Sequence, residues 1–118
     1  MDLEIVVRKE TAEIAEVLLR GRADLQTAGQ LNGRITALVE EGYRHILLNM
    51  RRVRFIDSMG LGTLIGASRR VAEANGSLRL VRPSPAVTSA LELTRLTDAF
   101  SVHESAHDAV VALARGVR

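Results

Sequence analysis

The residues with the clearest chemical potential in this 118-residue chain form one short segment, Asp57-Ser58-Met59-Gly60-Leu61-Gly62. The segment follows a strand-like apolar run and opens a stretch in which apolar residues recur at helical spacing. The first turn of a helix has unpaired backbone N–H groups and a positive partial charge, and both favour an anionic group. Ser58 is therefore a candidate acceptor of a phosphoryl group from a separate kinase. The glycines after it would let backbone or a partner approach closely.

Other interpretations of the same segment compete with phosphorylation. Ser58 could simply cap the helix, which is a common role of serine. The spacing Gly60-x-Gly62-x-x-x-Gly66 is close to a dinucleotide-binding pattern, but the last interval is wrong and no acidic residue ends a second strand about 20 positions later. A phosphoaspartate receiver would need an acidic pair after an early strand and a lysine near the last strand. The only lysine is Lys9, in the first predicted hairpin.

Length and composition predict one domain, residues 1–118, that carries no disulfide. A chain of 118 residues can bury a core without staples, and it contains no cysteine. No apolar stretch approaches the roughly 20 residues needed to span a bilayer. The N-terminus, Met1-Asp2-Leu3-Glu4, lacks the positive start and the apolar block of a secretory signal. We therefore expect a soluble, cytoplasmic protein without membrane association, either a monomer or a weak dimer.

Arginine supplies nearly all of the positive charge. The net charge is +2, yet the isoelectric point is about 9.9, and Lys9 is the single lysine among 16 basic residues. Arg51, Arg52 and Arg54 gather in what appears in the sequence as a connector before Asp57. This cluster could be a solvated surface, a contact for an acidic protein or a nucleic-acid patch. With so few aromatic residues to stack on bases, we expect no direct nucleic-acid binding.

The histidines give little support for a metal site. His103 and His107 are four residues apart, a spacing that can hold a metal on one helix. Ser105 is expected to begin a helix between them, so the two rings should point apart. We predict no metal, no cofactor and no enzymatic activity.

The elements that must position the segment alternate between strands and helices. Strands are predicted at 3–8, 13–20, 46–48, 78–81 and 99–102, with the second strand closed by Gly21-Arg22-Ala23-Asp24. Helices are predicted from Thr27, whose Thr27-Ala28-Gly29-Gln30 run fits a capping box, to Gly42, and from the segment to about Asn75-Gly76. Shorter helices should follow Ser84-Pro85 and Ser105. This order predicts an α/β fold, a mixed sheet of four to five strands with four to five α-helices, with the site at the carboxyl ends of strands.

Nearly the whole chain resembles the anti-sigma factor antagonists (anti-anti-sigma factors), small proteins of the STAS domain family. The run Phe55-Ile56-Asp57-Ser58-x-Gly60-Leu61-Gly62 is similar to the phosphorylation loop of that family, and Gly21-x-x-Asp24 is similar to its loop after the second strand. Tyr43 to Asn49, Gly76 and Pro83 to Val87 match further family features. The family often has Ser or Thr after the acceptor serine, where this chain has Met59.

The resemblance implies a regulator that works by switching partners. An anti-sigma factor with serine kinase activity would phosphorylate Ser58, and a serine phosphatase would remove the phosphate. The unphosphorylated form would bind the anti-sigma factor and free its sigma factor. Ser58 would be the switch, Asp57 would shape the loop, Gly60 and Gly62 would give access, and the expected partner-binding residues are Asp24, Asp57, Ser58, Met59, Gly60, Leu61 and Gly62. The alternatives are a small nucleotide- or anion-binding module at the same helix entrance, and a non-phosphorylated scaffold subunit of a stress-signalling complex.

Overall fold

The computed structural model describes residues 2–116, which form one mixed sheet with four α-helices and a short 3₁₀ helix, Thr97–Ala99. The strands are β1 (Leu3–Lys9), β2 (Ile14–Ala23), β3 (His45–Ile56), β4 (Ser77–Val81) and β5 (Ser101–His103). The helices are α1 (Ala28–Glu40), α2 (Ser58–Glu73), α3 (Pro85–Leu93) and α4 (Ala106–Ala114). The strand order is β1-β2-β3-β4-β5, with β1 antiparallel to β2 and all other pairs parallel. The predicted α/β class and mixed sheet are confirmed.

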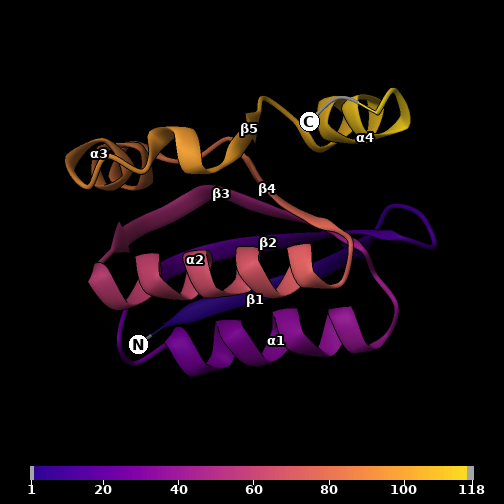
Figure 1. The fold of residues 1–118 in the computed structure, drawn as a ribbon. Helices are drawn as coiled ribbons and strands as arrows, with labels where there is room; N and C mark the ends of the chain where they lie inside the picture. Colours follow the sequence, from indigo (N-terminus) through magenta and orange to yellow (C-terminus); the bar gives the residue numbers. More distant parts are fainter. Residues whose placement is uncertain (1, 117–118) are drawn as a thin grey trace.

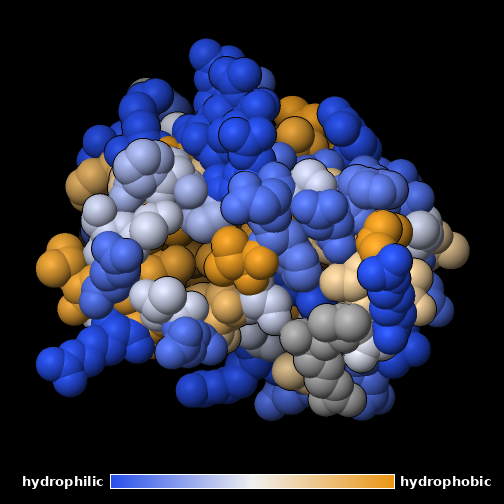
Figure 2. Space-filling view, turned by 90° about the horizontal axis from the view of Figure 1, so that it is seen from above, coloured by the Kyte–Doolittle hydropathy of each residue, from blue (hydrophilic) through white to orange (hydrophobic). Residues whose placement is uncertain are grey.

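Helices cover both faces of the sheet, but one face has a large core and the other only a small one. Helices α1 and α2 lie side by side on one face, and the main core forms between them and the sheet, with α3 closing it beside β3 (Figure 1). Helix α4 covers a smaller cluster on the other face, made of Ile14, Leu47, Val81 and Ala109. The run Ile46–Leu48 is continuously apolar because its side chains enter both cores in turn. Seen from the side of α3 and α4, the surface is mostly hydrophilic, with small separate apolar areas (Figure 2).

Most helix ends follow from local chemistry that the sequence reveals. Gly42 has φ 104°, and its N–H donates to Val39 while that of Tyr43 donates to Leu38, a Schellman ending for α1. Ser84 and Ser105 accept backbone N–H groups at the starts of α3 and α4. These predicted boundaries are confirmed.

The predicted capping box at the start of α1 is wrong. The Thr27 hydroxyl makes no cap hydrogen bond to α1. It donates instead to the Arg22 carbonyl (2.8 Å) and accepts from the Asp24 N–H (3.0 Å). Gln30 turns away and donates to the Leu3 carbonyl at 2.9 Å. Thr27 thus satisfies backbone groups of the segment before α1, and Gln30 satisfies one in β1.

The predicted ends of the second and third strands are also wrong. Residues 51–56 are not a connector but the second half of β3, and β2 continues beyond Gly21 to Ala23. Val53 lies opposite Gly21, and Ile56 lies opposite Ala23, with both apolar side chains buried. Two register shifts between β2 and β3 break the alternation, and the interposed arginines conceal the strand pattern in the sequence. The last strand, predicted at 99–102, begins at Ser101, after the 3₁₀ turn.

Candidate functional site

The structure gives Asp57 and Ser58 different tasks at the entrance of α2. Asp57 is the N-cap in extended conformation, and its Oδ1 accepts the Gly60 N–H at 2.9 Å. Ser58 is the first residue of the helix and is exposed. Among residues 2–116, its hydroxyl has no hydrogen-bond partner. The capping role proposed for Ser58 therefore belongs to Asp57, and the serine hydroxyl is available to an incoming group.

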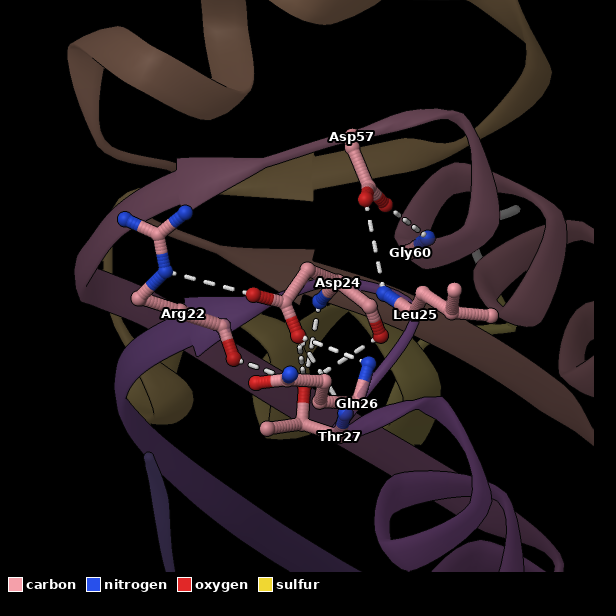
Figure 3. Close-up of polar contacts among 7 residues, drawn as sticks. All are labelled: Arg22, Asp24, Leu25, Gln26, Thr27, Asp57 and Gly60. Carbon is pink, nitrogen blue, oxygen red and sulfur yellow. Dashed lines mark hydrogen bonds and ion pairs between the residues drawn. The ribbon is translucent and has the colours of Figure 1, made fainter. Parts of the chain in front are cut away.

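Asp57 also joins the entrance of α2 to the loop between β2 and α1. Its Oδ2 accepts the Leu25 N–H at 3.4 Å (Figure 3). The Asp57 N–H donates to the Ala23 carbonyl at 3.2 Å. Both loops leave the carboxyl ends of neighbouring parallel strands, so one carboxylate can reach both. The carboxylate therefore holds the two loops together beside Ser58.

Asp24 organises the β2–α1 loop. Its carboxylate accepts hydrogen bonds from Arg22 Nε (3.2 Å), the Gln26 N–H (3.0 Å) and the Thr27 N–H (3.2 Å) (Figure 3). Burial alone would raise the pKa of Asp24, but these donors and the Arg22 charge outweigh it and hold the pKa below its usual range. With 8% of its surface exposed, Asp24 shapes the loop more than it offers a free carboxylate.

The residues after Ser58 divide between surface and core. Met59 is 48% exposed and Gly62 is exposed, as the sequence interpretation requires. The structure revises the roles expected of the other two. Leu61 belongs to the main core. Gly60 is packed so closely that a Cβ there would lie 2.2 Å from the Ala23 carbonyl oxygen, so this glycine serves helix–strand packing and not access for a partner.

Two exposed apolar residues lie next to Asp57, outside the segment that the motif marks. Leu25 is 66% exposed in the loop tied to Asp57, and the Phe55 ring lies 4.0 Å below the Arg22 guanidinium. Both line a shallow pocket of about 350 Å³ together with Arg22, Asp24, Gln26 and Asp57. The sequence feature that could have identified them is an apolar residue next to charged or polar ones, as in Asp24-Leu25-Gln26 and Arg54-Phe55.

The described residues provide no clustered ligands for a metal. Within residues 2–116, no group of three or more His, Cys, Asp or Glu side chains could hold an ion. His103 Nε2 lies 3.1 Å from Arg79 Nη1, a hydrogen bond that occupies the ring nitrogen. The same part of the chain has no helix long and apolar enough to cross a membrane.

The structure thus presents a small mixed α/β sheet with an exposed serine at the entrance of α2. The family model of the STAS domain matches residues 6–109, and the chain therefore belongs to the STAS domain family. This confirms the family that the sequence motifs indicated.

Individual relatives agree with this assignment. The chain is 29% identical over 89 residues to the anti-sigma-B factor antagonist of Staphylococcus aureus (strain NCTC 8325 / PS 47), which covers 75% of this chain and 82% of the relative. The unphosphorylated form of the anti-sigma factor antagonist SpoIIAA superposes with a TM-score of 0.80 at 23% identity, over 98% of this chain and 99% of that one. The phosphorylated form of SpoIIAA, a Bacillus cell fate determinant, gives 0.74 at 23% identity, over 93% and 99%. At these identities the solved structures show a shared fold.

Proposed function

We propose that this protein is an anti-sigma factor antagonist whose binding is switched by phosphorylation of Ser58. Unphosphorylated, it binds an anti-sigma factor with serine kinase activity and releases the sigma factor held there. Phosphorylation of Ser58 ends that binding, and a serine phosphatase restores it. The protein acts in the cytoplasm as a binding regulator and not as an enzyme.

The observation that carries this proposal is the separation of cap and acceptor at the start of α2. Asp57 fills the capping position, so Ser58 keeps an exposed hydroxyl at the positive end of a 16-residue helix. A phosphate there would lie near the helix N-terminus, which favours negative charge. The name of the S. aureus relative and the two phosphorylation states of SpoIIAA support the same interpretation.

The physical basis of the switch is the charge that the phosphate adds inside a closed interface. A kinase must bring the transferred phosphoryl group into line with the Ser58 hydroxyl, so its nucleotide site has to close over the start of α2. The product phosphate, with a charge of about −1.5 to −2, would then face other anionic groups. Like-charge contact at an interface costs several kcal/mol, which is enough to abolish a micromolar complex.

The partner surface around Ser58 combines this polar centre with apolar side chains. Met59, Leu25 and Phe55 expose apolar atoms beside the serine, and Gly62 leaves open space on the same helix. Flexible methionine suits an adaptable contact. Asp57 and Asp24 hold the two loops in register, while Gly60 and Leu61 keep α2 seated on the sheet.

Intact-mass measurement after incubation with ATP and candidate anti-sigma kinases tests the proposal. We expect the mass of one phosphoryl group to be added, and Ser58→Ala to abolish the addition. Thr63→Ala is the control, because it removes a different hydroxyl of α2, which donates to the Met59 carbonyl at 2.9 Å. This variant should still be phosphorylated. Unchanged mass with every kinase, or phosphorylation that survives in Ser58→Ala, would contradict the proposal.

A further inference from the structure

One part of the sheet has no helix over it. In β2, Ala15, Val17 and Leu19 face the main core, so Leu18, Arg20 and Arg22 face the opposite side. Helix α4 covers this side only around Ile14, Leu47 and Val81. Beyond that cluster, the Arg20 side chain is 65% exposed. Val6, across from Leu18 on β1, is 52% exposed.

Arginines gather on this uncovered part, and we call Arg20, Arg22, Arg52 and Arg54 the arginine face. Arg20 lies directly opposite Arg52 in the β2–β3 register, and Arg22 lies opposite Phe55. Arg54 reaches the same area, since it lines a small pocket with Arg20 and the acidic residues Asp2 and Glu4. The face thus joins the carboxyl halves of β2 and β3.

The acidic residues nearby neutralise only part of this charge. Arg22 pairs with Asp24 at 3.2 Å, and Arg20 lies 4.0 Å from Glu4. Within residues 2–116, Arg52 and Arg54 form no ion pair. Like charges directly opposite each other destabilise a sheet, so the Arg20–Arg52 pair works against folding. An anionic partner bound between Arg20 and Arg52 would relieve this repulsion.

We propose that the arginine face docks an acidic segment of a protein partner. Guanidinium groups bind carboxylates through two parallel hydrogen bonds, and the face presents several of them on a rigid sheet. It ends where β3 leads into Asp57 and Ser58, so one partner could contact both surfaces. The inference goes beyond the proposed function because it holds whether or not Ser58 accepts a phosphate.

A protein partner fits this face better than a nucleic acid does. Single strands are held by base stacking on aromatic rings. Tyr43 and Phe100 are buried, and one side of the Phe55 ring is covered by Arg22. Glu4 and Asp2 stand beside Arg20 and Arg54, and a phosphate backbone carries only negative charge to meet them. An acidic protein segment can place an uncharged or basic residue at that point while its carboxylates meet the arginines.

The test measures binding of a fluorescein-labelled poly-L-glutamate peptide by fluorescence anisotropy. The Arg52→Gln/Arg54→Gln variant should bind about tenfold more weakly than the unmodified protein. The control, Arg34→Gln/Arg69→Gln, removes the same charge from exposed positions on α1 and α2 and should stay within about twofold. The affinity for the peptide should fall as salt is raised.

Equal losses in the two variants, or no peptide binding at low salt, would overturn the proposal. Tighter binding to a single-stranded oligonucleotide, or to phosphatidylglycerol vesicles, than to the peptide would overturn it in favour of a nucleic acid or a membrane. The melting temperature of Arg52→Gln should equal or exceed that of the unmodified protein, because a like-charge pair is removed. A fall of several degrees would give Arg52 a structural role and would also overturn the proposal.

Discussion

At the scale of single residues, the consecutive residues Asp57, Ser58 and Met59 have different roles in the site. Asp57 uses both carboxylate oxygens internally, one for the helix and one for the adjacent loop. Ser58 and Met59, the next two residues, are exposed. The residue that holds the loops and the residues exposed to a partner are thus separated along three consecutive positions. Substitutions here should affect either binding or folding, and seldom both.

Met59→Glu should weaken binding to the proposed kinase partner and leave the fold intact. Met59 is half exposed, so a charge there stays solvated in the free protein, and the free energy of unfolding should change by less than about 0.5 kcal/mol. Met50→Glu is the control, because Met50 is fully buried in β3 and a charge there should cost several kcal/mol. Urea unfolding and titration calorimetry separate the two effects. A loss of several kcal/mol in Met59→Glu would contradict the assignment.

The glycines of the segment should respond oppositely to alanine. In Gly60→Ala the new Cβ would meet the Ala23 carbonyl oxygen and Ile56 Cγ1, at 2.2 and 2.8 Å, and overpacking should destabilise the domain by about 1–3 kcal/mol. Gly62→Ala meets no atom within 4 Å and should stabilise the helix by about 0.5–1 kcal/mol. Denaturant unfolding of both variants measures this. Equal stabilities would refute the packing role of Gly60.

At the scale of elements, the start of α2 should tolerate a phosphate. A negative charge at a helix N-terminus stabilises it by roughly 0.3–1 kcal/mol, and repulsion from the neighbouring Asp57 offsets part of that gain. The melting temperature of the protein phosphorylated on Ser58 should therefore lie within a few degrees of the unmodified value. Differential scanning calorimetry of the two forms is the measurement. Loss of a cooperative transition on phosphorylation would show that the switch acts by unfolding and not by charge at the interface.

The sequence predicted elements well where local chemistry determines them and poorly where tertiary pairing does. Gly42, Ser84-Pro85 and Ser105 mark helix ends through their own backbone conformation or hydrogen bonds. The second half of β3 was not predicted because its arginines, which point to solvent, interrupt the apolar pattern of a strand. Only pairing with β2 keeps this part of the chain extended. The site shows the same division. The exposed serine follows from its motif, but the burial of Gly60 against Ala23 depends on a contact 37 residues away, which local spacing cannot reveal.

At the scale of the whole molecule, a polar cluster away from Ser58 links β3, β4 and β5. His45 Nδ1 lies 2.9 Å from Ser77 Oγ, and Arg79 contacts both Ser77 and His103. Burial, followed by the charges of Arg44 and Arg79, lowers the pKa of His45 despite Glu13. Burial and Arg79 likewise lower the pKa of His103 despite Asp108. The folded protein therefore favours the neutral form of both rings.

Stability should fall in mildly acidic solution for this reason. In the unfolded chain the histidines take up protons near their usual pKa of 6.5, whereas the folded protein takes them up only at lower pH. The contribution of the two neutral histidines to the free energy of unfolding is complete above about pH 6.5. It is lost as the pH falls through their pKa values in the folded protein. Urea unfolding at about pH 7.5 and about pH 5.5 should show the loss, and His103→Gln should reduce it. His107→Gln, at an exposed position, is the control; an equal effect of both variants would contradict the account.

The proposed switch requires that the charge on Ser58 decides whether the partner binds. Isothermal titration of Ser58→Ala and Ser58→Asp against the cognate anti-sigma factor tests this most directly. Alanine removes the acceptor without adding charge, so Ser58→Ala should bind as the unphosphorylated protein does. Ser58→Asp should bind at least about tenfold more weakly, because its carboxylate is placed where the interface must close. Equal affinities of the two variants would show that the charge on Ser58 is not the switch.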